Sequence, residues 1–294
     1  NSFNSYITEE EIADGVTPAE PKSAAYSDGV GKKPERKATS KVYNGDFTER
    51  AAAIAIDNNN AERVAFYNCQ FLSSQDTLYT GSKSNRIYFR DCVIEGQTDY
   101  IFGGNTCVFD NCDFNWAGFG SSPKGGHITA VKNASTQKGY LLYGGSVNAA
   151  STQGGQFVVG DFGRPWGGND SPTAAIGVKI NNLPDGTSSI APAGWGNWST
   201  PAKESQYYEY GTLDAGGKKI DLTNRNALVP NEWDMLAFNP YRYLIKDGDN
   251  WDPMNVKSVW EPVIAKLGEV VIHDSETIKK TAVDAYEVSG QFTL

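Results

Sequence analysis

The sequence predicts an all-β fold in which strand-containing coils stack on one another as a parallel β-helix. The first observation is an internal repeat, because VAFYNCQF at 64–71, IYFRDCVI at 87–94 and CVFDNCDF at 107–114 align with one another. The second is their spacing of 23 and then 20 residues, which is typical of solenoid coils. The third is their composition of aromatic and β-branched residues, which favours strands.

Each repeat has two strands separated by a corner. Side chains two residues apart share one face of a strand, so the aromatic residues at equivalent positions are expected to form one inward ladder. These residues are Phe66, Phe89 and Phe109. Asparagine and aspartate tolerate the left-handed backbone conformation that a corner requires. The expected corner residues are Asn68, Asp91 and Asn111.

The four cysteines fall at inward positions of the same repeats. They are Cys69, Cys92, Cys107 and Cys112. A buried free cysteine behaves as a small apolar residue. We therefore expect reduced thiols in the core. Disulfide bonds between stacked neighbours are the alternative, although parallel side-chain directions do not favour them.

Composition and charge exclude several classes of function. The 294-residue chain has a net charge of -9 and no basic stripe, which argues against a nucleic-acid partner. No run of eighteen apolar residues exists, so no membrane-spanning helix is expected. His127 and His273 are the two histidines, and neither lies beside a nucleophile motif or at zinc-binding spacing. We therefore expect no metal and no cofactor, and catalysis by carboxylates, amides and arginine.

Two aspartates repeat at the interval of the coils. Asp76 lies in SSQDTLYTG and Asp99 in IEGQTDYIFG, and the 23 residues between them also separate Phe66 from Phe89. Adjacent coils lie about 4.8 Å apart, so the two carboxylates are expected to share one site. Such a pair divides into an acid and a nucleophile or base. The alternative is that each aspartate only caps a turn.

Five stretches resemble the motifs of pectin methylesterases, the aspartyl carbohydrate esterases. They are QDTLY at 75–79, GQTDYIFG at 96–103, GRPWG at 163–167, APAGWGNW at 191–198 and YYEY at 207–210. The similarity covers roughly residues 46 to 250. It implies a right-handed parallel β-helix and the hydrolysis of methyl esters of polygalacturonate to pectate and methanol.

The resemblance also implies catalytic roles. Asp99 would be the nucleophile, and Asp76 would protonate departing methanol and then activate water. Gln75 would donate its amide to the developing oxyanion. Arg164 would hold Asp99 ionised and aimed through a charge-assisted hydrogen bond. Without the resemblance, a structural ion pair would be the expected role of Arg164.

Substrate-binding residues follow from the same resemblance. Trp166 and Phe102 match positions that contact the sugar, and Tyr79 and Trp195 are weaker candidates, with Trp195 placed on the groove wall. The family has a second oxyanion glutamine one coil earlier. Arg50 lies nearest that place here, so the oxyanion site departs from the pattern.

The expected organisation has three parts. Residues 1–45 form a polar arm with a short helix and a loop, residues 46–250 the catalytic β-helix, and residues 251–294 a helical segment and tail that pack on it. Asp252-Pro253 suits a helix start, and Gly268 suits its end. The early coils of the family are expected to come from a missing N-terminal fragment or a second polypeptide.

The expected function is therefore that of a pectin methylesterase acting on pectin outside the cell or in the periplasm, the location that the family implies. Two alternatives remain open. One is a thioesterase or other ester hydrolase on the same scaffold, and the other is a carbohydrate-binding β-helix with impaired catalysis.

Overall fold

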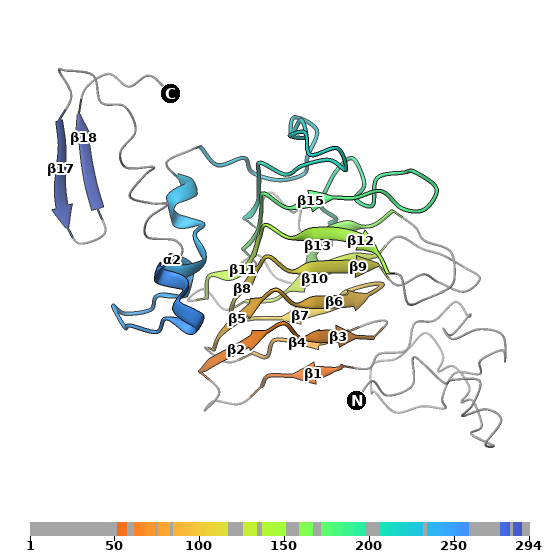
Figure 1. Ribbon diagram of the computed structural model, residues 1–294, viewed down its shortest axis with the longest axis horizontal. Helices are drawn as coiled ribbons and strands as arrows, with labels where there is room; N and C mark the ends of the chain where they lie inside the picture. Colours follow the sequence, from red (N-terminus) through yellow and green to blue (C-terminus); the bar gives the residue numbers. More distant parts are fainter. Residues whose placement is uncertain are drawn as a thin grey trace. The chain divides into compact units, whose positions relative to one another are not determined.

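The structure is a computed structural model, and its main body is a stack of short parallel strands (Figure 1). It describes residues 52–57, 62–73, 76–82, 85–116, 126–133, 137–150, 159–166, 172–197, 206–231, 234–258, 277–282 and 285–289. The chain divides into two compact units, Asn1–Trp251 and Asp252–Leu294. The predicted arm at 1–45 lies outside the described residues, and the three-part division stays a prediction.

The first unit contains three sheets whose neighbouring strands all run parallel. The first sheet, in spatial order, contains β1 (Ile54–Ala55), β4 (Leu78–Tyr79), β7 (Ile101–Gly103), β10 (His127–Val131) and β13 (Asp161–Pro165). The second contains β2 (Arg63–Tyr67), β5 (Arg86–Arg90), β8 (Thr106–Asp110), β11 (Gly139–Tyr143), β14 (Thr173–Ile176) and β16 (Tyr207–Tyr210). The third contains β3 (Gln70–Leu72), β6 (Val93–Gly96), β9 (Asp113–Trp116), β12 (Ser146–Ala149) and β15 (Lys179–Ile180).

The chain visits the three sheets in turn and then returns to the first, one coil further along the stack (Figure 1). Each of the first five turns therefore adds one strand to every sheet, and β16 then extends the second sheet alone. The predicted all-β parallel β-helix is confirmed.

The aromatic ladder is confirmed as well. Phe66 pairs with Phe89 and Phe89 with Phe109 in the register of β2, β5 and β8. Their rings stack at centroid distances of 5.0 and 4.8 Å. Phe89 and Phe109 are fully buried. Burial of each such side chain contributes about 1.5–3 kcal/mol, and each ring pair about 0.5–1.5 kcal/mol more.

The corners have the backbone that the sequence predicts. Asn68, Asp91 and Asn111 have φ values of 50°, 51° and 54°, which is the left-handed region. Asparagine and aspartate adopt it more readily than other residues with a Cβ. A β-branched residue at any of these corners would strain the turn between the second and third sheets.

The cysteines are all free thiols, as expected. Cys92, Cys107 and Cys112 are buried in the core, and Cys69 packs against it. Cys107 lies opposite Ile87 on the neighbouring strand, and burial raises the pKa of its thiol. The four thiols therefore act as small apolar core residues in this structure.

A short helical region follows the last strands of the first unit. It contains the 3-10 helix η3 (Asp234–Ala237) and the helix α2 (Pro240–Leu244), which packs beside β8, β11 and β5. The side chain of Asn239 accepts hydrogen bonds from the first backbone N–H groups of α2, and Pro240 takes the first helical position. At the other end, Lys138 Nζ donates to the carbonyls of Arg242, Tyr243 and Ile245 at 2.9–3.0 Å.

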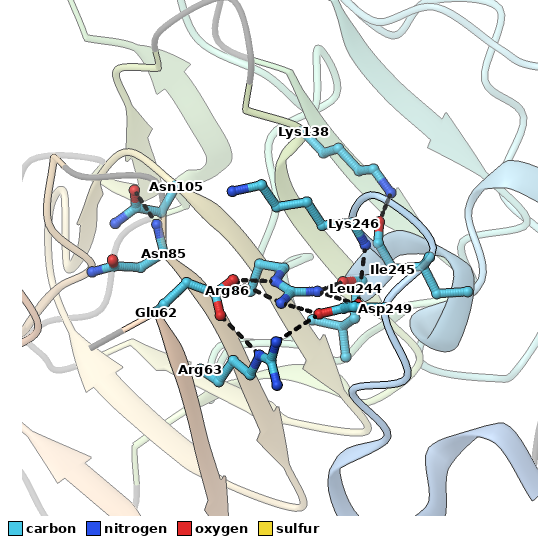
Figure 2. Close-up of polar contacts among 10 residues, drawn as sticks. All are labelled: Glu62, Arg63, Asn85, Arg86, Asn105, Lys138, Leu244, Ile245, Lys246 and Asp249. Carbon is cyan, nitrogen blue, oxygen red and sulfur yellow. Dashed lines mark hydrogen bonds and ion pairs between the residues drawn. The ribbon is translucent and has the colours of Figure 1, made fainter. Parts of the chain in front are cut away.

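A buried arginine on β5 holds the segment that follows α2. Figure 2 shows Arg86 between Glu62 and Asp249, with Arg63 beside them; these four residues are called the Arg86 cluster. Arg86 donates from Nε to Glu62 at 2.7 Å and from Nη2 to Asp249 at 2.5 Å. Its Nη1 donates to the carbonyl of Leu244 at 2.8 Å. With 4% of its side chain exposed, Arg86 joins three parts of the chain through its guanidinium.

The second unit is described in two pieces. The 3-10 helix η4 (Pro253–Asn255) begins after Asp252, with proline at the first position, as the sequence predicts for this start. Residues 259–276 lie outside the described residues, so the predicted end at Gly268 is not tested. The expected tail contains an antiparallel pair, β17 (Thr277–Ala282) and β18 (Ala285–Ser289). The residues between these strands, Val283 and Asp284, lack the Asn-Gly or Asp-Gly signal of a tight hairpin, which is why the sequence did not indicate it.

Candidate active site

Strands of the first sheet bring the two predicted aspartates to the same level. Leu78 pairs with Ile101 and Tyr79 with Phe102, so Asp76 lies opposite Asp99, two residues before each of the first pair. The strands of such a sheet are about 4.8 Å apart. Both aspartates have left-handed backbones, with φ values of 60° and 48°. Each aspartate therefore lies at the bend that leads into its strand. The register of the two strands also places the two aspartates next to each other.

Asp99 forms a bidentate ion pair with Arg164. The Nε of Arg164 donates to Oδ1 of Asp99 at 3.0 Å, and Nη2 donates to Oδ2 at 2.6 Å. The side chains of Arg164 and Asp99 are 24% and 13% exposed. A planar fork of this kind fixes the orientation of a carboxylate as well as its charge.

Arg164 reaches Asp99 across the strand that lies between them. Arg164 lies on β13, whereas Asp99 precedes β7, and β10 lies between these two strands. On β10, Ala130 pairs with Arg164 on one side and with Phe102 on the other. Asp99 lies three residues before Phe102, so the side chain of Arg164 extends diagonally across β10 to form its two hydrogen bonds.

The glycine before the arginine is required by close packing. A Cβ atom at Gly163 would lie 1.9 Å from Oγ1 of Thr129 and 2.7 Å from its carbonyl oxygen. Thr129 Oγ1 itself donates to the carbonyl of Phe162 at 2.8 Å. The glycine of GRPW therefore allows β13 to lie against β10, which sets the position from which Arg164 extends.

Aromatic side chains extend from the ion pair. Tyr79 and Phe102 stack with centroids 4.9 Å apart, and Phe102 meets Trp166 edge to face at 6.0 Å. Trp166 is 36% exposed, and the Nζ of Lys132 lies 5.5 Å from the centroid of its ring. Tyr79, Phe102, Trp166 and Lys132 are called the aromatic surface below. It offers apolar ring faces and one cation next to the two aspartates.

Trp195 corrects one expectation. It is 2% exposed and packs against Phe162 and Tyr207 with centroids 5.3 and 4.9 Å away. Its Nε1 donates to Oε2 of Glu209 at 3.1 Å. A large ring whose N–H has a partner is more stable inside the stack than on a groove wall. The predicted place of Trp195 on the groove wall is therefore wrong.

Two predicted site residues, Gln75 and Arg50, lie outside the described residues. The structure brings together Asp76, Asp99 and Arg164, with Tyr79, Phe102 and Trp166 beside them. The catalytic and substrate-binding roles of all these residues stay predictions.

Sequence reasoning missed a further pair beside this site. His127 on β10 lies directly opposite Asp161 on β13, and its Nδ1 is 2.7 Å from Oδ1 of Asp161. Burial raises the pKa of Asp161, and the hydrogen bond with His127 opposes that effect. The signal was present in the alignment of three strands, DYIFG, HITAV and DFGRP, which places His127 level with Asp99. It was overlooked because His127 has no nucleophile motif next to it in the sequence.

Metal-binding and membrane-spanning features are absent from the described part of the chain. No cluster of three or more His, Cys, Asp or Glu side chains with a geometry suited to a metal ion occurs among those residues. No helix there is both long and apolar enough to span a membrane.

The chain is similar to curated pectinesterases over much of its length. It is 33% identical to pectinesterase 31 of Arabidopsis thaliana over 171 residues, covering 57% of this chain and 47% of that protein. It is 34% identical to probable pectinesterase A of Aspergillus flavus over 184 residues, covering 61% of this chain and 50% of that one. The chain thus spans about half the length of the curated relatives it matches.

Solved structures share the fold. A pectin methylesterase in complex with a hexasaccharide has a TM-score of 0.53 at 23% identity, covering 74% of this chain and 64% of that one. A pectin methylesterase from Erwinia chrysanthemi has a TM-score of 0.52 at 20% identity, covering 79% and 66%. The pectinesterase family itself matches residues 36–231, which is more than half of the chain. The chain therefore belongs to the pectinesterase family.

Proposed function

We propose that this chain hydrolyses the methyl esters of polygalacturonate to pectate and methanol. The observation that carries the proposal is the Asp99 carboxylate, oriented by both hydrogen bonds of Arg164, with Asp76 level with it on the next coil. Membership of the pectinesterase family and the aromatic surface beside the pair support the same reaction.

In the first step, Asp99 attacks the carbonyl carbon of the ester. A carboxylate oxygen has two acceptor positions, so an oxygen that accepts from Arg164 keeps a lone pair for the attack. Asp76, protonated, gives its proton to the departing methoxy oxygen, and methanol leaves as the C–O bond breaks. The product is a covalent acyl-enzyme on Asp99. The amide of Gln75 is assigned, by resemblance, to the oxyanion that forms on the carbonyl oxygen.

In the second step, water attacks the acyl carbon. Asp76, now ionised, takes a proton from this water while the oxygen of the water bonds to the acyl carbon. The bond to Asp99 then breaks, which restores the ionised nucleophile and releases the uronic acid, and this acid loses its proton to the solvent and becomes uronate. The proton on Asp76 is ready for the next ester. No group outside the protein and water is needed for the balance of this cycle.

The substrate assignment rests on the surface around the aspartates. The rings of Tyr79, Phe102 and Trp166 suit the apolar faces of sugar units, and Lys132 supplies a positive charge for an acidic polymer in a chain whose net charge is -9. A hexasaccharide occupies the related pectin methylesterase, which supports an oligosaccharide substrate here. Since polygalacturonate lies outside cells, we place the reaction in the extracellular space or the periplasm.

The test measures three products from one incubation with methylated pectin: methanol, new reducing ends and unsaturated sugars. Methanol release without new reducing ends or unsaturated sugars supports the proposal. Chain cleavage would identify another class of pectin enzyme, and no product with retained pectin binding would favour the carbohydrate-binding alternative. Thioester hydrolysis without methanol release would favour the thioesterase alternative.

Two variants complete this test. Asp76→Asn should reduce methanol release about a hundred- to ten-thousand-fold, because methoxide would leave without a proton. Asp113→Asn is the matched control, since Asp113 lies on β9 in the third sheet and accepts from Ser146 at 2.6 Å. A loss of only a few-fold in Asp76→Asn would reduce Asp76 to a structural role.

A further inference from the structure

Four titratable side chains lie at one level across four neighbouring strands of the first sheet. The pairing of Thr129 with Ile101 places His127 level with Asp99, two residues before each. Asp76 lies level with Asp99 on the other side, and Asp161 pairs directly with His127. The order across the sheet is therefore Asp76, Asp99, His127 and Asp161. The proposed nucleophile has a carboxyl group on one side and an imidazole on the other.

The ring of His127 is held at one edge. Its Nδ1 meets Asp161, and Gly196 packs over the same edge, because a Cβ at Gly196 would lie 3.1 Å from Nδ1 and 2.6 Å from Oδ2 of Asp161. The side chain of His127 remains 18% exposed. The same Cβ would lie 3.0 Å from Cε1, so Gly196 covers the edge formed by Nδ1 and Cε1, and the opposite edge of the ring carries Nε2 and Cδ2. Among the described residues, no hydrogen-bond partner of Nε2 is found.

The charges around His127 decide whether a carboxylate of the substrate can bind beside it. Among the described groups, Asp99 and Asp76 lie on one side of His127, on the preceding coils. Asp161 and Arg164 lie on the other side, on β13. The buried hydroxyl of Tyr207 lies near Asp161, Asp99 and Arg164. Arg164 is committed to Asp99 by two hydrogen bonds. A carboxylate on the substrate would meet net negative charge here unless His127 is protonated.

Resting on the proposed function, we propose that His127, held by Asp161, is a specificity-determining residue. Its Nε2 contacts a free carboxylate of the uronate chain, next to the ester that is bound at Asp99. When the imidazole is protonated, Nε2–H donates to that carboxylate and the charge of the His127–Asp161 pair is zero. When it is neutral, Nδ1–H still donates to Asp161, but Nε2 is an acceptor and the pair carries one negative charge. The site then repels a free carboxylate and still accepts a fully esterified chain.

The test compares two galacturonate oligomers of equal length. One is fully methyl-esterified, and the other has one free carboxylate next to a methyl ester. Histidine changes its charge between about pH 5 and about pH 8, whereas uronate carboxylates stay ionised over that range. The measured quantity is kcat/KM for the second oligomer divided by kcat/KM for the first. Other pH effects on catalysis act on both oligomers and cancel in this ratio.

In the wild type, the ratio should fall about three- to tenfold from the acid to the alkaline end, through the KM of the second oligomer, as expected for one partly exposed charged hydrogen bond. In His127→Gln the ratio should not change with pH, because an amide keeps a donor but has no charge to lose. Asp161→Asn, which lets the ring turn, should weaken the change. Lys132→Met is the control: it should lower the ratio equally at both ends, since lysines keep their charge in this range.

A wild-type ratio that is constant with pH, or one that changes equally in His127→Gln, would overturn the inference. The proposed function is judged separately, because methanol from the fully esterified oligomer supports it whatever the ratio. Calorimetry with fully de-esterified oligogalacturonate needs no turnover. Its affinity should weaken with rising pH in the wild type and not in His127→Gln, and equal behaviour of the two would also reject the role of His127. Thermal unfolding of each variant checks that the fold is kept.

Discussion

Arg86 and Arg164 both connect distant parts of the same stack through carboxylates, yet their surroundings differ. Arg86 has 4% of its side chain exposed and bonds to Glu62, to Asp249 and to a backbone carbonyl. Arg164 has 24% exposed and holds Asp99, which is itself 13% exposed. The guanidinium of Arg86 is excluded from solvent and joins parts of the fold, whereas its partners Glu62 and Asp249 are 35% and 23% exposed. Arg164 orients a carboxylate that a substrate can still reach.

This difference in exposure predicts that Arg86 contributes mainly to stability and Arg164 mainly to catalysis. A buried charge that loses its partner costs several kcal/mol, so the Arg86 cluster matters for folding. A partly exposed ion pair contributes about 0–1 kcal/mol to stability, so the Arg164–Asp99 pair is explained better by chemistry than by folding. The predictions below test this division from the largest expected effect to the smallest.

Asp99→Asn is expected to have the largest effect. Removal of a nucleophile should lower methanol release about ten-thousand-fold or more, because an amide oxygen cannot form the acyl-enzyme. The unfolding midpoint should stay close to that of the wild type, with Asp113→Asn as the control carboxylate. Substantial remaining activity would exclude Asp99 as the nucleophile.

Arg86→Met should act on stability instead. It removes the charged hydrogen bonds to Glu62 and Asp249, although Arg63 stays beside both carboxylates. The free energy of unfolding should therefore fall by about 1.5–3 kcal/mol. Urea unfolding measures this change, and kcat/KM per folded molecule should remain near the wild-type value. Arg90→Met is the matched control on the same strand. Arg90 is 31% exposed and lies 3.6 Å from Asp91, so its loss should cost about 1 kcal/mol or less.

Arg164→Met should show the opposite pattern. Loss of the fork should lower kcat about a hundred- to a thousand-fold, as for removal of other oriented donors in active sites, with about 1 kcal/mol or less of stability lost. Arg164→Lys keeps the charge without the planar fork and should be intermediate. If Arg164→Met were as unstable as Arg86→Met, the proposed division between the two arginines would fail.

Acid stability gives the smallest effect. The hydrogen bond from Arg86 lowers the pKa of Asp249 from 3.8 to about 2. Because the pKa is lowered on folding, the resulting stability is present above the unfolded value and is lost as pH falls through the folded one. The free energy of unfolding should therefore decline between about pH 4 and about pH 2. In Arg86→Met the decline over this window should be shallower, and equal slopes would mean that Arg86 does not set the ionisation of Asp249.

The repeat makes the core predictable from the sequence. Phe66, Phe89 and Phe109 stack as their spacing indicates, because strand periodicity and coil length are local properties. The corner at Asn68 follows from backbone preference, which is local as well. The same spacing predicts that Asp76 lies level with Asp99, and the register of β4 and β7 agrees.

Tertiary structure decided which partners the polar side chains have and where Trp195 lies. The Asp249 partner of Arg86 is 163 residues away, and no periodicity relates the two, since their distance depends on where the chain returns after α2. His127 and Asp161 do occupy equivalent positions on adjacent strands, but the hydrogen bond between their side chains is visible only in the structure. The same holds for Trp195, whose motif suited a groove wall but whose indole N–H found Glu209 inside the stack. Sequence thus determined the coils and the register of the two aspartates, whereas long-range packing determined which polar side chains surround them, because hydrogen-bond partners are chosen by proximity in space.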